Sequence, residues 1–321
     1  ILDKYPNAEN GETALVGLQE SLSLQGRSEE FSTYLNGYRK SNPTNNNLQN
    51  VEFEAAKSLV FNQSYQEAIN ALQNFIRNYP NSAQLPEARY YLGDAHFRLG
   101  DKAQALSIYN SIENTSDNNL KSRVFQKIAQ IEFENGNFSK AIPYYEFTSE
   151  NARSKAEEYE STYGLMLSYF ETKAYDKAVA SADKILDLGR ITLDSEPIAM
   201  LIKAKSLENS NAVDQAVTVY RNLMESHKTE QGAEALYKLA LIYHQKGQFT
   251  ASNELVFDNS QPFTQYAYWY GKQFIVLARN YIALDEKFQA KATLESIIEN
   301  TSEVSIKEEA ETLLKTINPA N

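Results

Sequence analysis

Few residues of this 321-residue chain could carry out acid–base or metal chemistry. There is no cysteine, and the three histidines are His96, His227 and His244. No two of them are three or four residues apart, the spacing at which two side chains on one helix can hold a metal ion together. The acidic pairs Glu157-Glu158 and Glu308-Glu309 are adjacent, and adjacent residues on a helix face different directions.

Motifs that place catalytic groups on loops are missing as well. The chain has no Gly-x-Gly-x-x-Gly sequence, no phosphate-binding loop and no Gly-x-Ser-x-Gly nucleophile motif. A catalytic solenoid would need clustered titratable side chains, and the sequence shows none. We therefore predict no metal, no cofactor and no enzymatic activity, with an enzyme whose site is unrecognised as the remote alternative.

Composition indicates a protein with a core and an acidic surface. Hydrophobic residues make up 42% and aromatic residues 12% of the chain, which is more than a disordered segment carries. The formal charge of −11 disfavours a surface for the phosphates of nucleic acid or for anionic lipid. No stretch approaches 18 consecutive apolar residues, so we expect no membrane-spanning helix.

The elements that must position these residues follow a repeat of 36 to 38 residues. Each repeat contains a turn position, which in most repeats holds a residue that tolerates a left-handed backbone. Five residues after it comes a second position, which in most repeats holds a small residue. The eight turn positions are Gly26, Gln63, Gly100, Gly136, Lys173, Asn211, Gly247 and Asp285. The eight positions that follow them are Phe31, Ala68, Ala105, Ala141, Ala178, Ala216, Ser252 and Ala290.

A second row of mostly small residues lies twelve residues before the first. Its members are Gln19, Ala56, Gly93, Ala129, Met166, Ala204, Ala240 and Ala278. Small residues at two fixed places allow two helix backbones to approach closely, so each repeat is predicted to be helix A, a tight turn, helix B and a longer connection. The segment Ser64-Tyr65-Gln66-Glu67 predicts a capping box at the start of one helix B.

The pattern in Tyr90-Tyr91-Leu92-Gly93-Asp94-Ala95, continuing through Gly100 and Ala105 to Tyr109, resembles the tetratricopeptide repeat family. The resemblance covers essentially the whole chain. It implies an all-α fold, a right-handed α-solenoid of about eight antiparallel helix pairs with a terminal capping helix. We expect one solenoid over residues 1–321, and we expect it to be a fragment of a longer repeat array. Residues 1–6 would be the tail of a preceding helix, 11–304 the repeats and 305–317 the capping helix.

The resemblance also implies a function, a non-enzymatic scaffold that binds another protein or a peptide segment. In this family helix A lines the concave surface of the superhelix. Carried over, the groove residues are Phe53, Val60, Tyr90, Asp94, Phe97, Gln126, Phe133, Tyr163, Phe170, Tyr237 and His244. The alternative is that these rings pack between neighbouring helices. An inner polar row of mixed sign, which includes Lys57, Asp94 and Lys205, lacks the family's pattern for gripping the acidic tails of chaperones.

One aromatic segment departs from the repeat pattern. Tyr266, Tyr268, Trp269 and Tyr270 are expected to open an unusually long last helix A and include the only tryptophan. They are either a plug in the core, against a short helix B over 249–257, or an aromatic contact patch for a partner.

A finer resemblance suggests a cellular context. The long period and the connection over 77–82 are similar to a bacterial envelope subclass, which includes the lipoprotein of the outer-membrane barrel-assembly machinery and periplasmic cell-division coordinators. The alternative function is thus an envelope assembly or cell-wall accessory factor. A periplasmic or envelope location is favoured, with the signal or anchor upstream of Ile1, and a cytoplasmic location stays open. The sequence leaves the partner's identity and the oligomeric state undetermined.

Overall fold

The computed structural model describes residues 10–27, 30–42 and 48–317, and the regular secondary structure within these ranges is helical. The chain forms two compact units, Ile1–Asn151 and Ala152–Asn321. The predicted tail of a preceding helix, residues 1–6, lies outside the described residues. That the repeats form one continuous solenoid over 1–321 stays a prediction.

The first unit contains four helical hairpins. Their helices are α1 (Gly11–Leu24), α2 (Phe31–Ser41), α3 (Leu48–Phe61), α4 (Tyr65–Asn78), α5 (Leu85–Arg98), α6 (Lys102–Asn110), α7 (Asn118–Glu134) and α8 (Phe138–Glu150). In each hairpin, the odd-numbered helix is the predicted helix A and the even-numbered helix is helix B.

The second unit contains four more hairpins and a final helix. Its elements are α9 (Lys155–Glu171), α10 (Tyr175–Leu188), α11 (Ser195–Asn209), α12 (Val213–Ser226), α13 (Glu230–Gln245), α14 (Phe249–Asn259), the 3-10 helix η2 (Gln261–Phe263), α15 (Ala267–Ala283), α16 (Lys287–Asn300) and α17 (Val304–Ile317). The described residues therefore confirm eight antiparallel pairs and a terminal helix.

All eight predicted turn residues adopt the left-handed backbone. Their φ angles lie between 60° and 85°, including the non-glycine residues Gln63, Lys173, Asn211 and Asp285. In each turn, the next residue donates its N–H to the carbonyl five residues earlier, as Asp101 does to His96 at 2.9 Å. This hydrogen bond satisfies a carbonyl at the end of helix A, so the turn ends one helix and directs the chain into the next.

The two rows of small residues form the contact between helix A and helix B. Every member of both rows is buried, including the larger Gln19, Phe31 and Met166. The Ser252 hydroxyl donates to the Ala240 carbonyl at 2.8 Å, which joins the two rows directly. A Cβ atom added to Gly93 would lie 2.7 Å from the Tyr109 ring, closer than real Cβ atoms come to other atoms. Most residues of the two rows are small because helix A and helix B leave no space for larger side chains between them.

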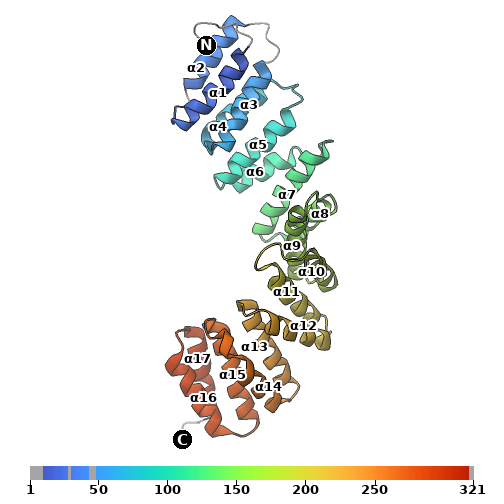
Figure 1. Ribbon diagram of the computed structural model, residues 1–321, viewed down its shortest axis with the longest axis vertical. Helices are drawn as coiled ribbons and strands as arrows, with labels where there is room; N and C mark the ends of the chain where they lie inside the picture. Colours follow the sequence, from blue (N-terminus) through green and yellow to red (C-terminus); the bar gives the residue numbers. More distant parts are fainter. Residues whose placement is uncertain (1–9, 28–29, 43–47, 318–321) are drawn as a thin grey trace. The chain divides into compact units, whose positions relative to one another are not determined.

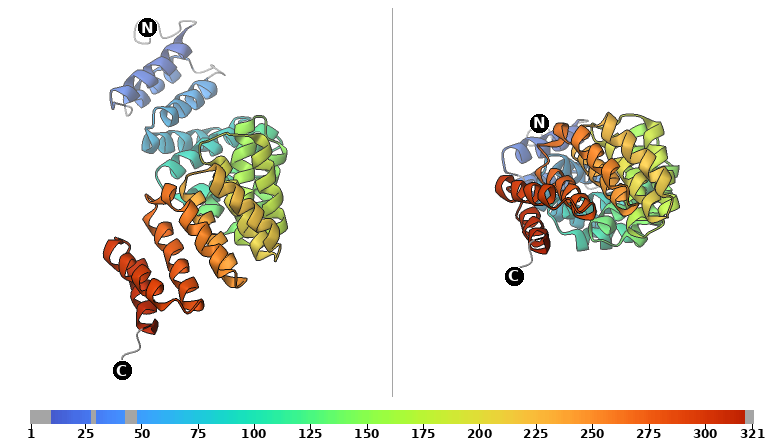
Figure 2. Two further views of the ribbon diagram at one scale, coloured as in Figure 1. Left: turned by 60° about the horizontal axis from the view of Figure 1, so that its bottom comes forward. Right: turned by 90° about the horizontal axis from the view of Figure 1, so that it is seen from below.

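The hairpins stack in two layers within each unit (Figure 1 and Figure 2). Each odd-numbered helix contacts the next odd-numbered helix of its unit, as α3 contacts α5 and α13 contacts α15. Even-numbered helices such as α10, α12 and α16 pack between the odd-numbered helices before and after them. The odd-numbered helices therefore bring side chains from successive repeats next to one another.

Two local expectations are wrong. Ser64 makes no capping hydrogen bond, because its hydroxyl lies 3.0 Å from the Ser23 hydroxyl of the preceding hairpin. Helix α15 is not unusually long, since it begins at Ala267 and matches α7 and α9 in length. The terminal helix α17 packs on the end of the array through the buried Ile306, which contacts Gly271 of α15.

Replacing Ala105 with leucine should lower the free energy of unfolding by about 1–3 kcal/mol, because Ala105 is fully buried between helices that cannot accept a larger side chain. Thermal unfolding followed by circular dichroism measures the loss. Ala103→Leu, on the exposed face of the same helix, is the control and should melt close to the wild type. Equal melting temperatures for the two variants would show that the helix contact is assigned to the wrong residues.

Replacing Lys173 with glycine should raise the free energy of unfolding by roughly 0.5–1 kcal/mol, because lysine has a left-handed φ of 63° there and glycine adopts it without steric cost. Ala180→Gly, on the exposed face of α10, should instead lower stability by about 0.5–1 kcal/mol. Denaturant titration separates the two signs. A loss of stability in Lys173→Gly would contradict the proposed strain at this turn.

Candidate functional site

The first unit has a polar hollow on its odd-numbered helices, which we call the α5–α7 hollow. Its volume is about 340 Å³, at the small end of the range of about 300–1,000 Å³ that is typical of ligand pockets. It is lined by Val60, Phe61, Gln63, Tyr65, Tyr90, Tyr91, Asp94, Arg98, Arg123 and Lys127. Three of these residues, Val60, Tyr90 and Asp94, belong to the predicted groove.

The α5–α7 hollow carries more positive than negative charge. Asp94 is its one carboxylate, and it lies 3.8 Å from Arg98 and 3.6 Å from Lys127. The third cation, Arg123, stacks on the Tyr90 ring at 4.0 Å and lies 5.4 Å from the Tyr91 ring. Among the described residues no carboxylate forms an ion pair with Arg123, so the hollow has an uncompensated guanidinium in an otherwise acidic protein.

Aromatic side chains form the floor and the rim of the hollow. Tyr90 is 8% exposed and packs against Tyr109, whose ring centroid is 5.8 Å away. Tyr109 is fully buried, and within the described structure its hydroxyl has no hydrogen-bond partner. Burial raises the pKa of Tyr109, so it stays a neutral phenol. At the rim, Phe61 is 65% exposed and packs edge-on against Tyr91.

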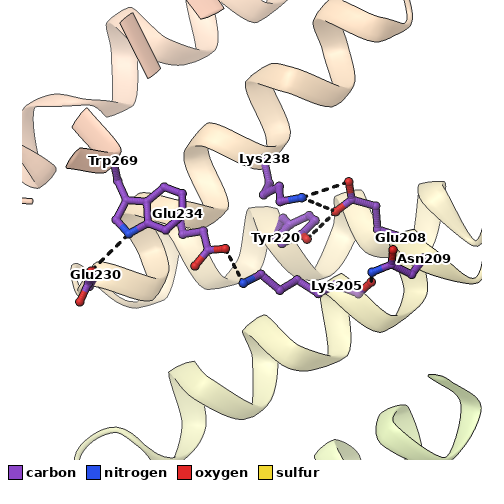
Figure 3. Close-up of polar contacts among 8 residues, drawn as sticks. All are labelled: Lys205, Glu208, Asn209, Tyr220, Glu230, Glu234, Lys238 and Trp269. Atoms are coloured by element: carbon purple, nitrogen blue, oxygen red, sulfur yellow. Dashed lines mark hydrogen bonds and ion pairs between the residues drawn. The ribbon is translucent and has the colours of Figure 1, made fainter. Parts of the chain in front are cut away.

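The same positions three repeats later form two ion pairs (Figure 3). Lys205 of α11 pairs with Glu234 of α13 at 2.5 Å. Glu208 accepts a hydrogen bond from the Tyr220 hydroxyl at 2.7 Å and pairs with Lys238 at 3.3 Å. We call this set the α11–α13 ladder. The ladder contains two lysines and two glutamates, and each lysine pairs with one glutamate, so its charges compensate one another.

The two sites correspond residue by residue. Asp94, Arg123 and Lys127 of the hollow occupy the repeat positions of Lys205, Glu234 and Lys238 in the ladder. Tyr109 corresponds to Tyr220, and Phe97 corresponds to Glu208. The hollow thus has no carboxylate at the two positions where the ladder has one. Asp94, at the position of Lys205, is the one carboxylate that lines the hollow.

Several of the predicted groove rings pack across the tight turn of their own hairpin. Phe133 contacts Phe138 with ring centroids 5.2 Å apart, and Phe170 contacts Tyr175 at 6.0 Å. His244 contacts Phe249 at 5.4 Å. Phe97 differs because Lys102 replaces the ring across its turn. Lys127 of the next repeat lies 4.7 Å from the centre of the Phe97 ring instead.

Three predicted groove residues are buried, the arrangement that the alternative of packing between neighbouring helices predicts. Phe53 is 1% exposed and packs between the rings of Phe75 and Tyr91. Val60 and Tyr90 are 6% and 8% exposed, and they contribute only an edge to the hollow. The reason is the spacing of the stacked helices, which lets a large apolar side chain on helix A reach the neighbouring repeat.

The other predicted groove residues are partly buried. Gln126 lies on α7, Tyr163 packs on Tyr159 of the same helix, and Tyr237 packs on Trp269 of α15. Their role in binding a partner stays a prediction.

The aromatic segment around Trp269 divides into different roles. The Trp269 indole N–H donates to Glu230 at 3.3 Å, and the Tyr266 hydroxyl donates to the Lys228 carbonyl at 3.3 Å, so both tie α15 to the preceding repeat. Tyr270 lines an uncharged cavity of about 640 Å³ between α15 and α16, and Tyr268 is 40% exposed. The aromatic residue that is fully buried beside α14 is Phe263, which is not one of the four residues of the predicted segment.

The three histidines lie in separate environments. His96 Nδ1 is 3.3 Å from Asp101, and His227 Nε2 is 3.6 Å from Glu196. His244 Nδ1 lies 2.7 Å from the side-chain oxygen of the buried Asn280. Over the residues with described positions, no three histidine or acidic side chains converge in a way that could hold a metal ion.

The sequence analysis missed Arg123 and Lys127, which carry most of the hollow's charge. They lie three residues before and one residue after Gln126, at repeat positions outside the predicted groove set. Aligning those positions would have shown that Arg123 replaces Glu234 while Asp94 replaces Lys205. This exchange of charge is the signal in the sequence that points to Arg123 and Lys127.

Comparison with known proteins agrees with the helical repeat. The family profile described as tetratricopeptide repeat matches residues 53–119, 127–190 and 203–258, more than half of the chain. A segment of 56 residues is 43% identical to the cell division coordinator CpoB of Escherichia coli (strain K12). This segment is 17% of the chain and 21% of that protein, so the match spans about a fifth of the relative's length.

Solved structures share the fold. A signal transduction ATPase with a tetratricopeptide repeat sensor from Pyrococcus horikoshii superposes with a TM-score of 0.55 at 13% identity, over 97% of this chain and 50% of that one. A tetratricopeptide repeat protein from Parabacteroides merdae ATCC 43184 gives a TM-score of 0.47 at 20% identity, over 84% and 98% of the two chains. In the described ranges, no helix is long and apolar enough to cross a membrane.

Replacing Glu208 with alanine should lower the free energy of unfolding by about 1–3 kcal/mol, because the buried Tyr220 hydroxyl and Lys238 both lose their acceptor. Glu225→Ala, at an exposed position of α12, is the control with the same change of charge and should stay within about 0.5 kcal/mol of the wild type. Urea denaturation compares them. A Glu208→Ala protein as stable as the control would show that the ladder contributes nothing to stability.

Proposed function

This chain belongs to the tetratricopeptide repeat family, and on that premise we propose that it holds a peptide or protein segment against the exposed faces of its odd-numbered helices. The repeats themselves imply a protein-interaction scaffold, and family and fold are typically non-enzymatic. In the proposal, the odd-numbered helices line a concave groove. Its candidate residues are Asp94, Phe97, Gln126, Phe133, Tyr163, Phe170, Tyr237 and His244, with Val60 and Tyr90 at the edge of the hollow.

One observation carries the proposal, the α5–α7 hollow with its exposed rim. An aromatic side chain that is 65% exposed, such as Phe61, loses contact with water when a partner covers it, which favours association. A neighbouring arginine adds directional hydrogen bonds, and aromatic residues and arginine are the residue types that dominate binding energy at protein interfaces. Phe61, Tyr91 and Arg123 bring both types together in one place.

A second candidate function is a role in the bacterial envelope. What favours it is the 56-residue similarity to a protein named a cell division coordinator, together with the long repeat period. In this reading, the scaffold assembles an envelope complex or assists a cell-wall enzyme, and it is located in the periplasm or at the envelope. Fractionation of cells that express the native full-length protein tests it, since recovery in the cytosol alone would contradict an envelope role.

The binding face can be tested with a photo-crosslinking amino acid. We expect p-benzoylphenylalanine at position 61, on the odd-numbered helix α3, to crosslink a partner protein in the native cells. The same amino acid at position 288 is the matched control, because Phe288 is an even more exposed phenylalanine (82%) at the start of the even-numbered helix α16. Gel shift and mass spectrometry identify the products. Crosslinking from position 288 and none from position 61 would contradict the proposed face.

A further inference from the structure

We propose that the α5–α7 hollow binds an acidic segment of the partner, with a carboxylate of that segment paired to Arg123 and Lys127 and a neighbouring apolar side chain on Phe61 and Tyr91. This inference rests on the proposed scaffold function and specifies the chemistry of the partner.

The first argument is the comparison with the α11–α13 ladder in the same chain. There, every inner cation has its own carboxylate, since Lys205 pairs with Glu234 and Lys238 pairs with Glu208. In the hollow, Asp94 is the one lining carboxylate, and it pairs with Arg98 and Lys127. Glu134 interacts electrostatically with Lys127 from outside the hollow, and among the described residues no carboxylate pairs with Arg123. The fold can therefore neutralise the cations at these repeat positions with its own carboxylates, as it does in the second unit. In the first unit the cations are not fully neutralised.

The second argument is the geometry of Arg123. It is half-buried, and taking a cation out of water is unfavourable unless an anion or hydrogen-bond acceptors replace the water. Its guanidinium carbon lies 4.0 Å from the centre of the Tyr90 ring and 5.4 Å from that of Tyr91, and both tyrosines also interact with it by side-chain hydrogen bonds. A guanidinium has five N–H donors, so donors remain for a carboxylate of the partner.

The third argument distinguishes a peptide from other anions. The chain has a net charge of −11, which repels a long polyanion such as nucleic acid, whereas a single acidic side chain meets only the local positive field. The hollow of about 340 Å³ has room for one or two side chains. Phe61 at the rim favours an apolar residue beside the acidic one, which inorganic phosphate would not supply.

The experiment measures the binding of two fluorescein-labelled peptides by anisotropy. The first alternates Glu and Leu over eight residues, and the second has Gln in place of each Glu. We expect the acidic peptide to bind the wild-type protein at least about tenfold more tightly than its Gln counterpart, and to bind more weakly as salt is added. Inorganic phosphate and an oligo-dT strand, tested as competitors, should not displace it.

Variants locate the site. Arg123→Gln and Lys127→Gln should each weaken binding of the acidic peptide by about tenfold. Lys140→Gln removes one positive charge from an exposed position on α8 and should leave binding unchanged. Phe97→Glu places a carboxylate at the position of Glu208, within reach of Lys127 and Tyr109. It should abolish binding and leave the melting temperature equal to or above that of the wild type.

Three outcomes would overturn the inference. They are equal affinity for the two peptides, no weaker binding in Arg123→Gln and Lys127→Gln than in Lys140→Gln, and displacement of the peptide by phosphate or oligo-dT. If any of these occurs while position 61 still crosslinks a partner, the scaffold function stands and only the acidic chemistry fails. If position 61 crosslinks nothing either, the proposed function fails with it.

Discussion

The close contact between helix A and helix B is the constraint on which the rest of the structure depends. Its two rows are so tightly packed that Gly93 has no space for a Cβ atom beside Tyr109, and Ser252 reaches the backbone of the facing helix. The left-handed turn keeps this contact in register, because it ends helix A at the same distance from the contact in each of the eight repeats. Each hairpin is then a unit of nearly constant dimensions, and constant units stack.

Regular stacking explains how one framework presents two different sets of side chains on its odd-numbered helices. Because successive odd-numbered helices of a unit contact each other, the same four positions of two neighbouring repeats lie on contacting helices. In the second unit they are Lys205, Glu208, Glu234 and Lys238, and they neutralise one another. In the first unit Asp94, Phe97 and Arg123 take the positions of Lys205, Glu208 and Glu234, which leaves positive charge and aromatic surface. Three changes of side chain thus alter the charge of this face, while both units keep the same hairpin architecture.

The helix pairs could be predicted from residue spacing, and the environment of the helix A side chains could be predicted only in part. Phe53 and Phe97 are both predicted groove residues, yet Phe53 is enclosed by Phe75 and Tyr91 while Phe97 lies beside Lys127. Periodicity assigns a residue to a face of its helix, but burial depends on the size of the side chains that the next repeat brings against that face.

The sequence by itself determined the number of hairpins, the position of every tight turn and the rows that form the helix contact. Turn chemistry and small residues act within one repeat, so their signal survives in local spacing. Only the tertiary structure decided that, among the described residues, Arg123 forms no ion pair with a carboxylate, Tyr109 has no hydrogen-bond acceptor and Trp269 ties two repeats together. These are contacts between side chains more than ten residues apart, or the lack of such contacts. They depend on which rotamer and which neighbour meet once the helices are stacked, and no spacing within one repeat records that.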